Sequence, residues 1–490
     1  MARSRRPRTK PAEDGDVLRV DDISELPPLA GSEAANDQDA GAEAPDEQEA
    51  PRPRFVKKAP PLPGMDDHPE PADLGKLALL PIPELVEQLR QYGVEAHAGI
   101  DRSKLLVFLM RSSDKLSLRL MGEGQIELMP DGYGFLRSSR NTFLPAPDDL
   151  YVAPALVKEY QLHPGMHIRG RVKKGRRKDK YFAIEEITEI NGKDPEHAKN
   201  LTRFDDLTPV FPDTRILLET QDARDFSARV VDIVAPIGFG QRGLIVSPPR
   251  SGKTMMLKAL ANAITTNYPD TKLLVFLVDE RPEEVTDMQR SVRGEVIAST
   301  FDEPPQRHVA VADRVDERAR SLVESGYDVV LLIDSITRLG RAFNAAARSS
   351  GRILSGGIES KALQKPKRLF GAARNIEGAG SLTILASALI ETNSRMDEVI
   401  FEEFKGTGNM EIVLSRAISE QRIYPAIDVH KSGTRMENLL FDPQEADFVN
   451  MLRTALADLP ATEAMEQLLK RMKKTGTNVE FLLSLKDAKF

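Results

Sequence analysis

A phosphate-binding loop carries the clearest chemistry in the sequence. The segment SPPRSGKT, from Ser247 to Thr254, lies between the apolar run RGLIVS and the helical pattern MMLKALANAI. Backbone amides of such a loop, and of the helix N-terminus that follows it, point at phosphate oxygens. Lys253 would reach the β- and γ-phosphates, and the Thr254 hydroxyl would bind Mg²⁺. We therefore expect a nucleoside triphosphate and Mg²⁺ here, although Ser247 replaces the first glycine of the general motif.

Two further apolar runs end in carboxylates that suit hydrolysis. DVVLLIDS ends in Asp334, and a buried strand that delivers a carboxylate beside a phosphate loop holds Mg²⁺ through water. KLLVFLVD leads into Asp279-Glu280-Arg281, where a carboxylate can polarise the attacking water. Glu280 is our candidate for this role, and we interpret Glu283 as a solvated acid at a helix start.

Two arginines occur late in the chain in turns flanked by proline or glycine. They are Arg422 in EQRIYPAID and Arg435 in KSGTR. An arginine finger supplied by a neighbouring subunit needs such a placement. From the residues alone, a salt-bridged surface arginine remains the alternative at both positions.

An aromatic and basic pattern precedes the phosphate loop. In DGYGFLR, Tyr133 and Phe135 share strand parity, so their rings point to one face, where bases could stack. A core pair within a hairpin is the alternative. The basic run IRGRVKKGRRKDKYF then leads into Tyr181 and Phe182. Basic residues beside interleaved aromatics favour an oligonucleotide-binding (OB) fold.

The elements that must position these residues divide the chain of 490 residues into composition zones. Helical spacing predicts a small bundle, and short alternating runs then predict a β-barrel. After a connector, which contains a predicted strand at Arg215–Leu218, strands alternate with helical patterns, which predicts an α/β fold with a parallel sheet. The predicted zones are 1–71 (charged disordered tail), 72–122 (helical bundle), 123–192 (OB-fold barrel), 193–226 (connector) and 227–490 (α/β domain).

Charge is unevenly distributed along the chain. The formal net charge of −7 comes from 68 basic and 75 acidic residues, and a mildly acidic total by itself argues against a polyanion partner. Residues 11–50 hold one base and thirteen acids, and residues 1–10 hold five bases. The formal charges of the remaining residues therefore sum to zero. The acidity thus belongs to the tail, which we interpret as either a solubilising segment or an interaction arm that competes with a polyanion.

Composition excludes several kinds of chemical site and of protein. The chain has no cysteine, which rules out disulfides, thiolate metal sites and a cysteine nucleophile. It has neither a membrane-length apolar run nor a secretory signal, so we expect a cytoplasmic protein.

The chain resembles the bacterial Rho family of transcription terminators from about residue 75 onward. The resemblance is carried by blocks such as DGYGFLR, GQRGLIVSPPRSGKT, VDERPEEVTDMQR, LLIDSITRLGRAFN, LSGGIESKALQKPKRLFGAARN and YPAIDVHKSGTR. It implies a RecA-like P-loop ATPase core and a homohexameric, ATP-driven RNA–DNA helicase that translocates 5′ to 3′ along RNA. The implied partners are cytosine-rich single-stranded RNA and the RNA polymerase complex.

The resemblance also implies an ATP site between subunits. Thr254 and Asp334 would hold Mg²⁺, Glu280 would activate water, and Arg281 would contact the nucleotide. Tyr424 would stack on adenine, where Phe is common, and Arg435 with Arg422 would come from the adjacent subunit. The implied nucleotide cradle comprises Gly238, Phe239, Gly240, Gln241, Arg242 and Gly243, and then Arg250 (often Lys), Ser251, Gly252, Lys253, Thr254 and Met255.

Two RNA sites follow from the same resemblance. A secondary site in a central pore would use Arg352 in the Q loop GRILSGGIES and Arg395 in the R loop TNSRMDEV, both where lysine is more familiar. In the primary site, aromatic rings would stack on cytosine while carboxylates accept from its amine. The primary-site residues are Asp131, Gly132, Tyr133, Gly134, Phe135, Leu136, Arg137, Asp149, Leu150, Tyr151, Asp179 (often Glu), Lys180 and Tyr181.

Two other classes of protein share parts of this pattern. A rotary ATP synthase subunit has a RecA-like core and an N-terminal β-barrel, but the aromatic strand and the basic run argue against it. An RNA-binding protein with a vestigial ATPase is opposed by the intact Lys253, Thr254, Glu280, Asp334 and Arg435.

Overall fold

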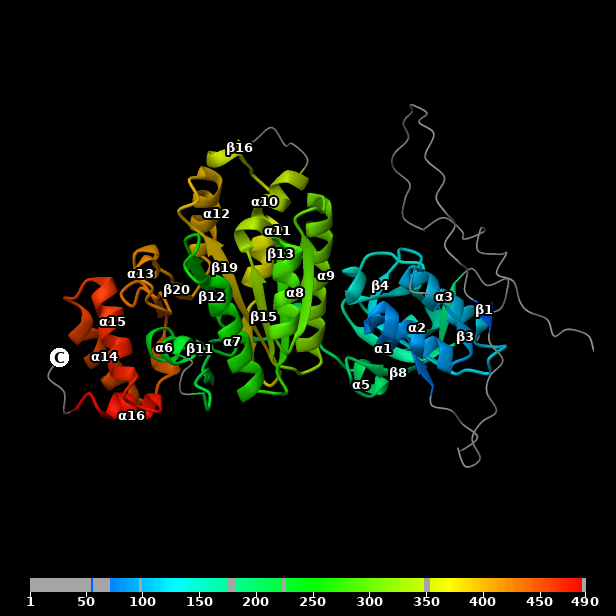
Figure 1. Cartoon of the computed structure of the whole chain (residues 1–490), viewed down its shortest axis with the longest axis horizontal. Helices are drawn as coiled ribbons and strands as arrows, with labels where there is room; N and C mark the ends of the chain where they lie inside the picture. Colours follow the sequence, from blue (N-terminus) through cyan, green and yellow to red (C-terminus); the bar gives the residue numbers. More distant parts are fainter. Residues whose placement is uncertain are drawn as a thin grey trace, which may run out of the picture.

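The computed structural model describes residues 54–55, 71–96, 99–173, 181–222, 226–347 and 353–486. The C-terminal helices, the α/β domain and the N-terminal domain follow one another across the long axis of the molecule (Figure 1). Within the segment predicted to be a disordered tail, β1 (Arg54–Phe55) pairs antiparallel with β3 (Val94–Glu95). None of the described helices is long and apolar enough to cross a membrane.

The small helical bundle predicted from the apolar spacing is present. Leu85 and Leu89 face its core from one helix, while Leu105 and Leu109 face it from the next. Asp101 starts that second helix by accepting the amide of Ser103 at 2.9 Å. The bundle comprises β2 (Ala72–Asp73), α1 (Leu74–Leu79), α2 (Ile82–Gln91) and α3 (Arg102–Ser112).

A closed barrel follows, as the fold prediction expected. Its strand order is β4-β5-β6-β8-β7, and β4 also pairs with β7, which closes the sheet. Alternate residues such as Ile126, Leu136 and Ile168 fill its interior. The barrel strands are β4 (Leu120–Leu128), β5 (Gly134–Arg137), β6 (Leu150–Val152), β7 (His167–Val172) and β8 (Phe182–Ile190), with the short helices α4 (Pro154–Glu159) and α5 (Pro195–Ala198).

The second domain contains a largely parallel sheet in the order β14-β13-β15-β19-β12-β20-β21. The first six of these strands run parallel, while β21 is antiparallel to β20. Their bounds are β12 (Arg242–Ser247), β13 (Lys272–Glu280), β14 (Glu295–Thr300), β15 (Val329–Asp334), β19 (Ser381–Leu389), β20 (Met410–Val413) and β21 (Gly433–Thr434).

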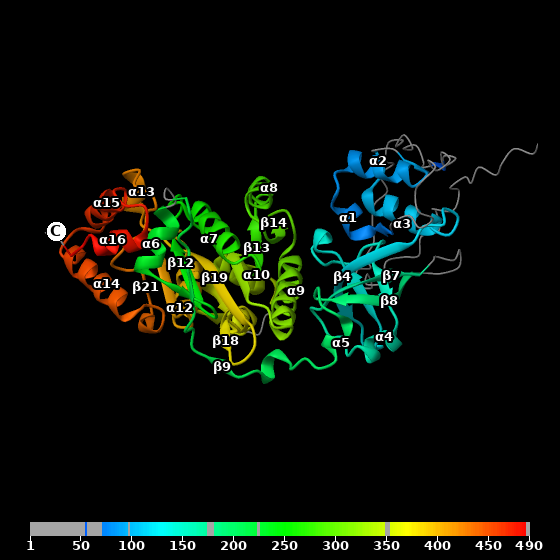
Figure 2. The ribbon, with the colours of Figure 1, turned by 90° about the horizontal axis from the view of Figure 1, so that it is seen from below.

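Helices cover both faces of this sheet, and the central strands β13, β15, β19 and β12 are largely buried, as the α/β prediction expected (Figure 2). The hydrophobic core on one face includes residues of α6 (Phe226–Val234), α7 (Lys253–Asn267), α8 (Pro282–Ser291), α13 (Arg416–Glu420), α14 (Pro443–Leu456), α15 (Ala461–Met472) and α16 (Asn478–Leu483). The other packs against α9 (Pro305–Glu324), α10 (Ile336–Ala346), α11 (Gln364–Gly371) and α12 (Arg395–Lys405).

The connector strand is shorter than predicted. Strand β10 covers Arg215–Ile216 and pairs with β11 (Ile237–Gly238), because the chain then turns and Asp232 accepts the amides of Leu218 and Glu219. Burial raises the pKa of Asp232 to about 7. Two further short strands were not predicted. β18 (Arg374–Ile376) pairs antiparallel with β19, and β9 (Pro209–Val210) pairs antiparallel with β18.

A tight turn before β12 requires glycine. Gly240 has φ +93°, and a Cβ added there would lie 2.1 Å from the amide nitrogen of Asn375. We predict that Gly240→Ala lowers the free energy of unfolding by about 2 kcal/mol or more, through backbone strain and this contact. Gly371→Ala is the control, because a Cβ there meets no described atom within 4 Å. Chemical denaturation measures both, and equal stability of the two variants would contradict the prediction.

Candidate functional site

The phosphate loop lies where β12 ends and α7 begins. Gly252 has φ +92° and leads directly into Lys253, the first residue of this 15-residue helix. The Ser247 and Ser251 hydroxyls lie 2.8 Å apart, and Ser251 also donates to the Pro248 carbonyl at 2.8 Å. Ser247, which departs from the general motif, therefore closes the loop with its side chain where the motif has glycine.

Three strands bring the charged residues of the site together. Glu280 ends β13 and Asp334 ends β15, and parallel neighbours end at the same sheet edge. A bulge at Asp279, with φ +55°, shifts the register just before Glu280. Lys253 Nζ lies 3.3 Å from Glu280 Oε1 and forms an ion pair with Asp334. Both carboxylates are almost fully buried, and each needs a cation nearby to offset its desolvation. They share Lys253 in this role.

Neighbouring groups fix these carboxylates further. Ser387 on β19 donates to Asp334 Oδ1 at 2.7 Å. Burial, followed by the charge of Glu280, raises the pKa of the Glu284 carboxyl on α8. Glu283 is exposed at the start of the same helix. Three carboxyl groups, those of Glu280, Glu284 and Asp334, thus lie around Lys253.

Arg338 is a site residue that sequence reasoning missed. Its guanidinium lies 3.2 Å from Glu280 Oε2 and donates to the Asp279 carbonyl. Arg338 follows Asp334 by four residues and lies in the first turn of α10. The Ser335 hydroxyl caps this helix by accepting the Arg338 amide at 3.2 Å. An arginine one turn after the acidic strand end is the only signal that could have found it.

Tyr424 borders the phosphate loop on its other side. Its ring atoms lie 3.6 Å from the position of a Cβ on Gly252, and the residue is 47% exposed. Met255, in the first turn of α7, is 70% exposed. Arg250 and Arg281 are exposed at the same sheet edge. An apolar surface therefore adjoins the phosphate loop, which suits a nucleotide base.

The first predicted nucleotide-cradle segment, Gly238–Gly243, lies elsewhere. It enters β12 at the strand end opposite the phosphate loop, about 17 Å away at the usual rise per residue. Gln241 Nε2 donates to Asn409 Oδ1 at 2.7 Å, and the Asn409 carbonyl accepts the Arg435 amide at 2.8 Å. Within one chain, this segment belongs to the surroundings of Arg435.

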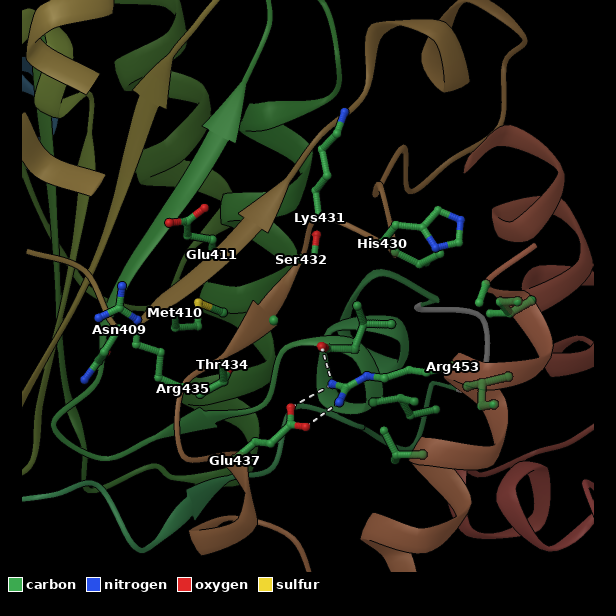
Figure 3. A pocket seen from close by; sticks show the side chains of 18 of the residues that line it. Asn409, Met410, Glu411, His430, Lys431, Ser432, Thr434, Arg435, Glu437 and Arg453 are labelled. Atoms are coloured by element: carbon green, nitrogen blue, oxygen red, sulfur yellow. Dashed lines mark hydrogen bonds and ion pairs between the residues drawn. The ribbon is translucent and has the colours of Figure 1, made fainter. Parts of the chain in front are cut away.

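Arg435 is exposed beside a surface pocket of about 530 Å³ between β21 and α14. Figure 3 shows Arg435 next to Asn409, and Arg453 facing Glu437. Arg453 Nη2 lies 2.7 Å from Glu437 Oε2, so α14 anchors the turn that carries Arg435. Arg422, with φ +61°, is exposed two residues from Tyr424, at the other end of β20. The structure does not bring the two arginines together.

Four aromatic rings cluster on one face of the barrel. The ring centroid of Phe135 lies 5.8 Å from Tyr133, 6.0 Å from Tyr151 and 5.1 Å from Tyr181. Tyr151 and Tyr181 are nearly parallel at 14°. Tyr133, Tyr151 and Tyr181 are partly exposed, whereas Phe135 is buried beneath them. The cluster therefore lies at the surface of the barrel rather than in its interior.

Arg137 differs from its predicted role. The resemblance placed it in the primary RNA site, but it is 4% exposed and pairs with Glu127 at 2.7 Å and with Asp149. Burial raises the pKa of Asp149 to about 6, although Arg137 opposes the shift. Leu136 and Leu150 point into the barrel interior, so their side chains do not face the cluster.

The pore-loop segments adjoin each other. The hairpin of β16 (Ile353–Leu354) and β17 (Ile358–Glu359) contains Gly356, where an added Cβ would lie 2.9 Å from the Arg395 carbonyl. Arg395 is exposed at the start of α12. Arg352, Asp179, Lys180 and residues 174–178 of the basic run lie outside the described residues.

The fold and these two sites define a class of protein: a RecA-like P-loop nucleotide hydrolase joined to an OB-fold domain. Residues 227–434 match the ATP synthase alpha/beta family, nucleotide-binding domain, and residues 122–196 match the Rho termination factor, RNA-binding domain. The transcription termination factor Rho of Cereibacter sphaeroides is 50% identical over 82% of this chain and 96% of its own length.

A second relative, the transcription termination factor Rho of Pseudomonas aeruginosa, is 50% identical over 84% of this chain and 99% of its own. A type III secretion ATPase structure aligns with a TM-score of 0.49 and 20% identity, over 57% of this chain and 87% of that one. The chain belongs to the transcription termination factor Rho family. It is an ATP-hydrolysing enzyme with an RNA-binding domain, so the rotary ATPase alternative is set aside.

Lys253→Ala should reduce ATP hydrolysis by about a hundredfold or more, because it removes the cation at the phosphates. RNA binding by the barrel should remain, which also reports that the variant is folded. Lys258→Ala is the matched control, since Lys258 lies on the same helix and pairs instead with Asp287. Hydrolysis by Lys253→Ala near the unmodified rate would contradict the site.

Tyr133→Ala should weaken binding of cytidine-rich RNA by about 1–3 kcal/mol, the value of one base stack. Tyr160→Ala is the control, because Tyr160 lies in the same domain but contacts Lys199 outside the cluster. Fluorescence anisotropy with an oligocytidylate measures both. Unchanged affinity of Tyr133→Ala would mean that the ring only supports the fold.

Proposed function

We propose that this protein terminates transcription as a homohexameric, ATP-driven translocase that moves 5′ to 3′ along nascent RNA. In this role it would separate RNA–DNA hybrids and release RNA from RNA polymerase in the cytoplasm. The observation that carries the proposal is the placement of the phosphate loop and Arg435 at opposite ends of one sheet. Such a chain can complete its ATP site only with a second copy.

The ATP site fits Mg²⁺ as well as nucleotide. Thr254 and Asp334 offer a hydroxyl and a carboxylate at the phosphate loop, and Mg²⁺ binds through few protein oxygens, with phosphates and waters completing its shell. The described residues contain no group of three or more His, Cys, Asp or Glu side chains placed to hold a metal ion by themselves. When bound, Mg²⁺ would neutralise charge on the β- and γ-phosphates.

Hydrolysis would use the residues that the sheet edge brings together. Lys253, now paired with Glu280 and Asp334, would turn to the phosphates, and Glu280 would then accept a proton from the attacking water. Arg338 would keep Glu280 oriented. Arg281 would contact the nucleotide and Tyr424 its adenine. Arg435 of one subunit would stabilise the charge that develops at the site of the next. Arg422 and Gly238–Gly243 would also lie at this interface.

Single-stranded RNA would bind at two places. The cluster of Tyr133, Phe135, Tyr151 and Tyr181 would stack pyrimidines, with cytosine preferred, and Asp131, Asp179 and Lys180 would border it. Asp149 is engaged by Arg137, so a role for it in accepting the cytosine amine requires it to exchange partners. Arg395, with Arg352, would grip the RNA backbone in the pore. The convergence of Lys253, Glu280 and Asp334 speaks against a vestigial ATPase.

Mixing two inactive variants tests the shared site. Arg435→Ala and Lys253→Ala should each lose ATP hydrolysis stimulated by poly-cytidylate. The first variant lacks the arginine finger, and the second lacks the lysine of the phosphate loop. A mixture should regain part of the activity, because some interfaces then join an intact loop to an intact finger. Steady-state hydrolysis with and without poly-cytidylate measures the recovery.

The matched control mixes Lys253→Ala with the double variant, which offers no intact interface. Full activity of Arg435→Ala alone would contradict the assignment of this arginine. Hydrolysis by the unmodified protein without any response to poly-cytidylate would contradict an RNA-driven motor.

A further inference from the structure

One carboxylate in the barrel bridges two arginines from different domains. Glu127 lies on β4 directly opposite Phe135 of β5. Its Oε2 accepts from Arg137 Nε at 2.7 Å, and its Oε1 accepts from Arg314 of α9, a helix of the ATPase domain. Both oxygens of the Glu127 carboxylate are therefore engaged, one on each side of the domain boundary.

On the barrel side, the bridge supports the aromatic cluster. The Arg137 guanidinium lies 5.0 Å from the centroid of the Phe135 ring, and Phe135 packs in turn against Tyr133, Tyr151 and Tyr181. Arg137 is buried, so its contribution is to fix this ring from beneath. Any shift of the Arg137 guanidinium would change the shape of the stacking surface.

On the ATPase side, α9 contacts the same stretch of β4 a second time. The Arg314 carbonyl accepts from Gln125 Nε2 at 2.9 Å, and Gln125 lies opposite Arg137 in the strand register. Gln125 and Glu127 of β4 thus both contact the helix, and their cross-strand partners are Arg137 and the cluster residue Phe135.

Docking of the two domains does not depend on Arg314. Asn191 is buried between them and donates to Ser321 at 3.0 Å and Ser325 at 2.9 Å, both on or just after α9. Arg318 donates to Asn191 Oδ1 at 2.7 Å, and Arg307 reaches Thr142 at 3.1 Å. Loss of the Arg314 side chain should therefore alter positioning while the domains stay together.

Charge gives the direction of the effect. The groups alternate in sign from Asp149 through Arg137, Glu127 and Arg314 to Glu317, which lies 2.8 Å from Arg314. Removing the Arg314 charge leaves Glu127 and Glu317 without their shared cation and adds negative charge near a surface that would bind a polyanion. Both effects weaken RNA binding.

We propose that Arg314 is a positioning residue for the primary RNA site, acting through Glu127 and Arg137. The ATPase domain then sets the affinity of the barrel for single-stranded RNA. The inference rests on the proposed function, because it takes the aromatic cluster to be the RNA-stacking surface.

The test measures binding of a fluorescent oligocytidylate to the full-length chain without ATP. Arg314→Gln should weaken binding about threefold or more. Glu127→Gln breaks the same bridge but also removes a negative charge, so its loss of affinity should be smaller. The double variant should be no weaker than the weaker single variant, since both act along one path. Arg320→Gln is the matched control on the same helix, because Arg320 pairs with Asp205 and Asp316. Its affinity should be unchanged.

Two further variants separate the possible failures. Unchanged affinity of Arg314→Gln, with a clear loss in Tyr133→Ala, overturns the positioning role and leaves the RNA surface intact. Unchanged affinity of Tyr133→Ala overturns the proposed RNA surface itself. Fully additive losses in the double variant overturn the path through Glu127.

Arg314→Lys keeps the charge but not the planar fork of the guanidinium, so it should lose less affinity than Arg314→Gln. Should Arg314→Gln unfold, wild-type affinity of Arg314→Lys overturns the proposal.

Discussion

The direction of the strands in the ATPase sheet is the constraint on which the function depends. Strands β12, β13 and β15 run parallel, so the phosphate loop, Glu280 and Asp334 meet at one edge. β21 returns antiparallel and leaves Arg435 at the opposite edge. In the proposed mechanism, the sheet therefore separates the two halves of the ATPase site within each chain. Assembly would then be part of the chemistry, because a neighbouring copy would bring Arg435 to each nucleotide.

At the end of the sheet that carries the phosphate loop, the ion pairs of Lys253 would rearrange when a nucleotide binds. Two buried carboxylates share Lys253, and a buried ion pair of this kind offsets its desolvation only while every charge is matched. A nucleotide with Mg²⁺ would supply both a new partner for the lysine and a cation for the acids. Arg338 keeps Glu280 paired during such an exchange, since it holds the second oxygen of that carboxylate.

Sequence reasoning was strongest where the signal is local. The phosphate loop and the acidic strand ends each show in a few consecutive residues, and parallel strands then bring Lys253, Glu280 and Asp334 together. Strand parity likewise predicted the shared face of Tyr133 and Phe135. The features that the sequence did not predict depend on long-range contacts. Arg137 is buried because Glu127 and Asp149 approach it from other strands, and Gly240 is required because Asn375 passes beside it. No pattern within one segment reports such partners.

If hydrolysis is a property of the contact between chains, then activity must depend on assembly. The measurement is the rate of ATP hydrolysis per chain, with saturating poly-cytidylate, across a dilution series in which light scattering follows the oligomeric state. We expect the rate per chain to fall as the oligomer dissociates and to vanish in the monomer. A verified monomer that hydrolyses ATP at the undiminished rate would contradict it.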